Sequence, residues 1–139
     1  MRKVRKTMLK VHHIGYLVKR IDKAEKDFTA LGFECIAPVV YDSLRDADIS
    51  FWEKNGYCVE LVSPKSEKSV VYDLLKKFKN MPYHICYSST DMNSDIEDLR
   101  KSGYMLLDEP MEAVAIEGRK VCFLFSANSG MVELLEAAE

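Results

Sequence analysis

The sequence predicts an α+β fold built from two copies of one βαβββ unit. Three observations predict it. The expected elements run in the order strand, helix and three strands, and this order occurs twice along the chain. Gly32 lies 19 residues after His13, and Gly103 lies 19 residues after His84, so each expected helix ends at the same distance from a strand histidine. Both units close on the same tripeptide, Val-Glu-Leu. The repeat therefore indicates two equivalent halves.

The first unit is expected to contain four strands and one amphipathic helix. It opens with residues 11–18, an apolar run of strand length. Apolar side chains at Ile21, Ala24, Phe28 and Leu31 then recur with helical spacing, and Gly32 ends the helix because it tolerates positive φ. Asn55-Gly56 is typical of a tight hairpin turn between two strands. The three later strands are expected at 33–40, 46–53 and 57–62.

The second unit repeats this order after a connecting segment. Val71, Leu74, Leu75 and Phe78 keep helical spacing, which predicts a short helix in the connection. The second unit has its own helix around Met92, Ile96 and Leu99, with strands at 83–87, 113–117, 120–125 and 131–135. We therefore predict one domain over residues 1–139, with a first repeat at about 11–63, a linker at 64–81 and a second repeat at about 82–136.

Composition narrows the class of protein. The 139 residues are 47% hydrophobic and 30% charged, which is typical of a soluble globular domain. With 22 acidic against 20 basic side chains, the chain lacks the positive charge of a nucleic-acid-binding protein. No apolar stretch is long enough to span a membrane, and no apolar segment follows the basic residues 1–7. We expect a cytoplasmic protein with neither nucleic acid nor membrane as partner, whose four cysteines are reduced and mostly buried.

Two histidines occupy equivalent strand positions. Because side chains alternate across a strand, His13 shares a face with Gly15, and His84 shares the corresponding face with Cys86. Both faces point away from the following helix, and the small residue two positions on leaves room beside the imidazole. His12 falls on the opposite face from His13 and is interpreted as structural.

Two carboxylates accompany these histidines. Glu60 and Glu133 lie in apolar strands, where an ionised carboxylate is costly unless a cation or hydrogen-bond donors meet it. Any one of these four residues alone is explained as well by a core or solvated position. Their matched repeat positions favour a shared metal ion instead. Nitrogen and oxygen ligands suit Zn, Ni, Co, Fe or Mn, and a site with open coordination positions indicates catalysis.

With these residues in place, the chain resembles the vicinal oxygen chelate superfamily, which includes glyoxalase I, methylmalonyl-CoA epimerase, extradiol dioxygenases and the fosfomycin and bleomycin resistance proteins. The resemblance extends from Val11 to Leu135 and is most specific at 13–16, 59–64, 83–87, 118–124 and 130–134. It implies paired βαβββ modules forming a half-open barrel around a metal site. It also implies that a divalent ion (Zn, Ni, Co or Mn) is bound by His13, Glu60, His84 and Glu133, and that the protein is a homodimer.

Within this superfamily the chain looks most like the methylmalonyl-CoA epimerase branch, through residues 69–75, 83–85 and 118–124. That likeness implies removal and return of a proton beside the thioester carbonyl of an acyl-CoA, through a metal-stabilised enolate. It implies Glu133 as one catalytic carboxylate and Asp48 as the other. The branch usually carries Glu at the latter position, and the loop 125–130 lacks its His-Pro-Lys run.

Other functions remain open at this point. The same ligand types serve a lactoylglutathione lyase of the glyoxalase I kind, which would take the thiol adduct of glutathione as substrate. An extradiol dioxygenase is less favoured, because its ligand set of two histidines and one carboxylate would leave Glu60 without a role. A non-catalytic small-molecule-binding protein of the same fold is the alternative outside enzymes.

Overall fold

The computed structural model describes residues 9–138. The prediction of a cytoplasmic location used the basic residues 1–7, and these lie outside the described residues. Within them, no helix has the length and apolar character needed to cross a membrane. All four cysteines are free thiols; Cys86 and Cys122 are buried and Cys35 is exposed.

The elements follow the predicted order, except that the second half also contains β6 (Met105–Leu106) and the 3₁₀ helix η1 (Val114–Ile116). The first half contains β1 (Lys10–Leu17), α1 (Ile21–Ala30), β2 (Glu34–Asp42), β3 (Ala47–Lys54) and β4 (Tyr57–Pro64). The connection contains α2 (Tyr72–Phe78). The second half contains β5 (Met81–Ser89), α3 (Met92–Lys101), β6, β7 (Met111–Ala113), η1, β8 (Arg119–Ser126) and β9 (Gly130–Glu136).

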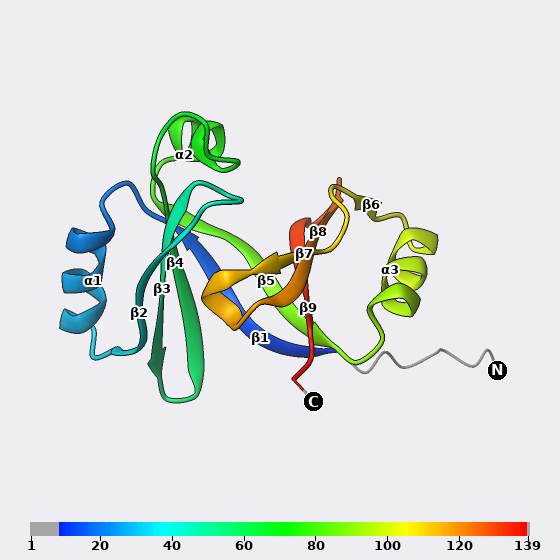
Figure 1. Ribbon diagram of the computed structural model, residues 1–139, viewed down its shortest axis with the longest axis horizontal. Helices are drawn as coiled ribbons and strands as arrows, with labels where there is room; N and C mark the ends of the chain where they lie inside the picture. Colours follow the sequence, from blue (N-terminus) through cyan, green and yellow to red (C-terminus); the bar gives the residue numbers. More distant parts are fainter. Residues whose placement is uncertain (1–8, 139) are drawn as a thin grey trace.

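All strands belong to one curled sheet in the order β2-β3-β4-β1-β5-β9-β8-β6, with β7 paired to β8. The two halves have the same internal pairing, because β1 lies parallel to β4 and β5 lies parallel to β9. The antiparallel pair β1 and β5 joins them at the centre. Figure 1 shows α1 and α3 at opposite ends of the molecule, each beside its own half. The predicted α+β fold of paired modules is confirmed.

Three apolar clusters stabilise this arrangement. One packs α1 onto the first half through Ala24, Phe28 and Trp52, and another packs α3 onto the second half through Ile96 and Leu134. The third lies on the inner side of the curled sheet, where strands of both halves meet; it includes Leu17, Ile49, Phe51, Val62, Cys86, Val121 and Leu135. The inner side is therefore a dry environment in which any polar group needs a partner.

The segment predicted as a strand at 113–117 is different in the structure. Only Ala113 belongs to a strand, β7, and the chain then forms η1. Glu117 and Gly118 both have positive φ, at 57° and 75°, and the amide of Gly118 donates to the carbonyl oxygen of Ala113. This tight turn ends the extended conformation, and it buries Ile116 in the inner cluster. The two-residue strand β6 was not predicted, because it is too short to show a period.

Candidate metal centre

The four central strands bring the predicted ligands into register. Gly15 of β1 lies opposite His84 of β5 and beside Glu60 of β4. Cys86 of β5 lies opposite His13 of β1 and beside Glu133 of β9. Each histidine therefore faces a small residue on the neighbouring strand. At Gly15 this room is essential, because an added Cβ would lie 2.0 Å from Cε1 of His84.

The four side chains converge on one point inside the sheet. His13 Nε2 lies 3.3 Å from Glu60 Oε1 and 3.2 Å from Glu133 Oε1. His84 Nε2 lies 3.5 Å from Glu60 Oε1 and 3.0 Å from Glu133 Oε1. The two Nε2 atoms are 3.4 Å apart, and all four donor atoms lie within 4.8 Å of one another. All four residues are at most 5% exposed.

These distances fit a divalent metal ion. With metal–ligand bonds of about 2.1 Å, neighbouring ligands are about 3.0 Å apart in an octahedral site and about 3.4 Å apart in a tetrahedral one. Among the described residues Glu133 Oε1 has no partner in hydrogen-bond geometry, although two imidazole nitrogens lie within 3.2 Å. The donor atoms are thus aimed at a common point rather than at one another. His13, Glu60, His84 and Glu133 would hold the ion.

Each imidazole also has an aromatic neighbour that the sequence analysis did not identify. Phe51 lies edge-on to His13, with ring centroids 5.3 Å apart, and Phe123 lies edge-on to His84 at 5.1 Å. In the sheet register Phe51 is opposite Glu60 and Phe123 is opposite Glu133. Each half therefore supplies one histidine, one glutamate and one phenylalanine. The repeat alignment of these strands is the signal that could have identified both rings.

The electrostatics of the metal-free cluster favour a protonated His13. Burial by itself lowers the pKa of His13, but the neighbouring carboxylates of Glu60 and Glu133 outweigh burial and raise the pKa to about 10. Burial likewise works to raise the pKa of Glu133, but His84 and His13 hold it far below its usual range. At neutral pH the cluster therefore contains an imidazolium beside carboxylate. A metal ion must displace that proton, since only the neutral imidazole binds metal.

Metal binding should accordingly depend on pH. We expect release of about one proton from His13 per ion bound between pH 7 and 9, and an affinity that rises about tenfold per pH unit toward pH 10. The stability of the metal-free protein changes with pH in the opposite direction to metal affinity. The contribution of His13 to the free energy of unfolding is complete below pH 6.5 and is lost as the pH rises through about 10. Calorimetric titration in buffers of different ionisation enthalpy measures the released protons. Binding without proton release would contradict this assignment.

At His12 the structure differs from the sequence interpretation. Val11 pairs with Tyr87 and His13 with Cys86, so His12 is an extra residue in a β-bulge and does not alternate to the opposite face. Its Nδ1 lies 2.9 Å from Nδ1 of His13. Burial lowers the pKa of His12, so its imidazole is neutral at pH 7 and its Nδ1 can accept a hydrogen bond from His13 Nδ1. That contact orients His13 with Nε2 toward the cluster.

His12, His13 and Cys86 form a second trio whose donor atoms lie within 4.8 Å of one another. The thiol of Cys86 makes this trio a poorer metal site than the four-residue cluster. Burial, followed by the charge of Glu133, raises the pKa of Cys86 far above its usual range. The thiolate that binds metal is therefore costly to form. The four-residue cluster is the better candidate.

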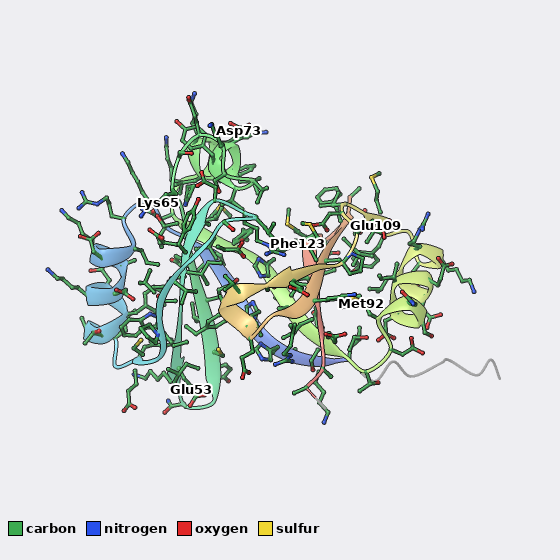
Figure 2. All side chains as sticks on the ribbon, viewed as in Figure 1. Glu53, Lys65, Asp73, Met92, Glu109 and Phe123 are labelled. Atoms are coloured by element: carbon green, nitrogen blue, oxygen red, sulfur yellow. The ribbon has the colours of Figure 1, made fainter. Side chains whose placement is uncertain are left out.

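The structure does not bring Asp48 to this centre. Its neighbours in β3, Ala47 and Ile49, belong to the inner cluster, so Asp48 points to the other side of the sheet. There its carboxylate lies 3.0 Å from Lys65 Nζ. In Figure 2 Lys65 and Phe123, which contacts His84, lie in separate parts of the molecule.

Another carboxylate, Asp42, lines a cavity beside the centre. It ends β2 and is 1% exposed. A small cavity of about 30 Å³ is lined by Asp42 and Arg45 together with Glu60 and Glu133. Asp42 Oδ1 accepts from the amides of Leu44 and Arg45, and Oδ2 accepts from Arg45 Nη1 at 2.7 Å. Both oxygens of this carboxylate are therefore engaged. The sequence analysis missed this pair, whose apolar surroundings come from distant segments.

Comparison with known proteins adds independent information on the fold. A family model described as Glyoxalase/Bleomycin resistance protein/Dioxygenase superfamily matches residues 12–123. No match is found among curated proteins.

Several solved structures have the same fold. A hypothetical protein from Bacillus halodurans superposes with a TM-score of 0.85 at 23% identity, covering 96% of this chain and 97% of that one. Methylmalonyl-CoA epimerase from Mycobacterium tuberculosis gives 0.83 at 20% identity, with coverages of 99% and 94%. A methylmalonyl-CoA epimerase variant from Streptomyces coelicolor, in complex with 2-nitronate-propionyl-CoA, gives 0.81 at 24% identity, with coverages of 94% and 98%. At these identities the likeness shows the fold.

Proposed function

The chain belongs to the glyoxalase/bleomycin resistance protein/dioxygenase superfamily, and from this premise we propose that it is a divalent-metal-dependent enzyme that removes and returns a proton beside a carbonyl group. The observation that carries the proposal is the convergence of two imidazole nitrogens and two carboxylate oxygens within 4.8 Å in a buried cluster. A metal ion held there would act as a Lewis acid on a carbonyl oxygen and stabilise negative charge that develops on it.

The proposed substrate class is an acyl-CoA thioester such as methylmalonyl-CoA. Its support is the similarity in fold to methylmalonyl-CoA epimerases, including one in complex with methylmalonyl-CoA. The proton beside a thioester carbonyl is weakly acidic, so a base and charge stabilisation must act together. Burial of the four residues strengthens both interactions, because solvent screens buried charges less.

Glu133 is the proposed proton carrier. Its carboxylate lines the small cavity and is ionised, because His84 and His13 hold its pKa below its usual range. His13 and His84 hold its Oε1 atom at 3.2 and 3.0 Å. Asp48 is not part of this proposal, since it lies on the other side of the sheet.

One observation favours a second candidate function. Epimerisation with two carriers requires carboxylates on both faces of the reacting carbon. Both oxygens of Asp42 are engaged by Arg45 and backbone amides, so residues 9–138 offer no free second carboxylate beside the proposed ligands. A single base suffices to move a proton between adjacent carbons, as a lactoylglutathione lyase of the glyoxalase I kind does on a glutathione hemithioacetal. The thiol adduct is therefore the alternative substrate.

Glu133→Gln tests the proton carrier. The metal-loaded wild type should exchange the α-proton of methylmalonyl-CoA in deuterated water, and the variant should be about 10²–10⁴-fold slower. Glu60→Gln is the matched control, because it changes the other carboxylate ligand and should slow exchange less at saturating metal. A hemithioacetal isomerase assay on the same samples separates the two substrates. The proposal would be contradicted if the metal-loaded wild type showed no proton exchange and no isomerisation.

A further inference from the structure

Arg45 is a charged side chain in the apolar surroundings of the candidate centre. Its side chain is 11% exposed. One guanidinium nitrogen, Nη1, donates to Asp42 Oδ2 at 2.7 Å and to the carbonyl oxygen of Glu112 at 3.0 Å. The other, Nη2, is buried and has no hydrogen-bond partner among residues 9–138. The contacts of Nη1 fix the plane of the guanidinium group and leave Nη2 as a preorganised donor.

A structural role explains only part of this arrangement. Asp42 and Arg45 close the turn between β2 and β3, and for that purpose the Nη1 contacts and the amide donors are sufficient. A buried charged donor without an acceptor is costly, and such groups in native proteins call for an explanation. An acceptor supplied by a ligand provides one.

The position of Arg45 indicates which ligand this is. Arg45 lines the small cavity that Glu60 and Glu133 also line, and it lines a larger cavity of about 280 Å³. The two cavities share Arg45, Val70, Val71, Tyr83 and Phe123, so they adjoin. A molecule in the larger cavity can therefore approach the candidate centre and Arg45 together.

Asp108, a half-buried carboxylate in the larger cavity, interacts with the charge of Arg45 without a hydrogen bond to Nη2. The walls of this cavity include the apolar side chains of Val70, Leu74 and Met111. The carboxylate of Asp108 accepts a hydrogen bond from the amide of Phe123 at 2.8 Å. No ion pair between Asp108 and Arg45 is present in the described part of the chain. In such surroundings a charge-assisted hydrogen bond from Nη2 is stronger than the same bond in water.

We propose that Arg45 is a specificity-determining residue, whose Nη2 binds a carboxylate of the substrate while another oxygen of the same molecule occupies the candidate centre. The substrate is thus a carbonyl compound that carries a carboxylate close to its reacting carbon. This inference rests on the proposed function, because the bound molecule is a substrate only if the protein is an enzyme. The anion site itself depends only on the cavity and the guanidinium group.

Equilibrium binding to the metal-loaded protein tests this without turnover. Malonate is the probe, and malonamide is the neutral molecule of the same size. Calorimetry should show that Arg45→Met weakens malonate binding by roughly ten- to a hundredfold and leaves malonamide binding unchanged. Metal affinity should stay at the wild-type value. Arg100→Met removes the same charge from the exposed face of α3 and should leave both probes unaffected.

A second variant guards against a folding defect, because Arg45→Met leaves Asp42 buried without its cation. Asp42→Asn/Arg45→Met removes both charges and should show the same loss of malonate binding. Unchanged malonate binding in both variants, or no malonate binding by the wild type, would overturn the proposal. Tighter binding of phosphonoacetate than of malonate would overturn the choice of carboxylate. If malonate binding depends on Arg45 but no proton exchange occurs, the proposed function fails and the anion site stands.

Discussion

His13→Ala is expected to abolish tight metal binding and to lower the free energy of unfolding of the metal-free protein by about 3–5 kcal/mol. His13 is 1% exposed and contacts both carboxylates, at 3.3 and 3.2 Å. Removing it leaves Glu60 and Glu133 close together with only His84 to offset their charge. Losing an outer partner of a ligand already costs ten- to a hundredfold in metal affinity, so losing the ligand should cost more than about a hundredfold.

His12→Ala is the matched control for this variant. It removes a neighbouring imidazole from the same strand but keeps all four proposed ligands. We expect it to bind one metal ion per chain, with an affinity reduced by at most about a hundredfold. Metal titration and denaturant unfolding measure both quantities. Equal losses in His12→Ala and His13→Ala would place the metal at the trio of His12, His13 and Cys86 instead.

Gly15→Ala is also expected to abolish tight metal binding, with a smaller loss of stability, although it adds only one methyl group. The new Cβ would lie 2.0, 2.3 and 2.5 Å from three atoms of the His84 ring, distances that van der Waals radii forbid. Gly15 and His84 are directly paired in the sheet, so the ring must leave the cluster or the strands must separate. We expect a loss of about 1–3 kcal/mol in stability and loss of tight metal binding.

A double variant isolates the cause. In the His84→Ala background the imidazole is absent, so Gly15→Ala should cost little. The coupling energy between the two substitutions should be about 1–3 kcal/mol. Denaturant unfolding of wild type, both single variants and the double variant without metal gives this energy. Strictly additive effects would mean that Gly15 is needed for a reason other than room for His84.

The fold and the four converging residues could be predicted from the sequence, because both follow from residue spacing within strands and helices and from the internal repeat. The positions of Glu60 and Glu133 follow from strand alternation and from a repeat that keeps nearly the same spacing in both halves. A shared centre then follows from the symmetry of the halves, since equivalent strands β1 and β5 lie side by side. The same reasoning, extended to Phe51 and Phe123, would have found the aromatic neighbours.

Other features depend on irregularities that have no period. The bulge at His12 shifts the register of β1 by one residue, and alternation then gives the wrong side for this imidazole. At Glu117 and Gly118 two consecutive residues with positive φ convert an expected strand into a turn.

The remaining features depend on contacts distant in sequence. Asp48 was assigned by resemblance, whereas alternation from Phe51, which lies opposite Glu60, places it on the outer side. Arg45 reaches the carbonyl oxygen of Glu112, 67 residues further along the chain. No local pattern in the sequence predicts such a contact.

X-ray absorption spectroscopy of the metal-loaded protein tests the central claim most directly. Each chain should bind one metal ion. The neighbours of the metal should be only nitrogen and oxygen atoms at about 2.0–2.2 Å, and two of them should be imidazole nitrogens. His13→Ala or His84→Ala should remove one imidazole contribution from any metal that is still bound. A sulfur neighbour at about 2.3 Å, which would come from Cys86, or a spectrum unchanged by both substitutions would contradict the account.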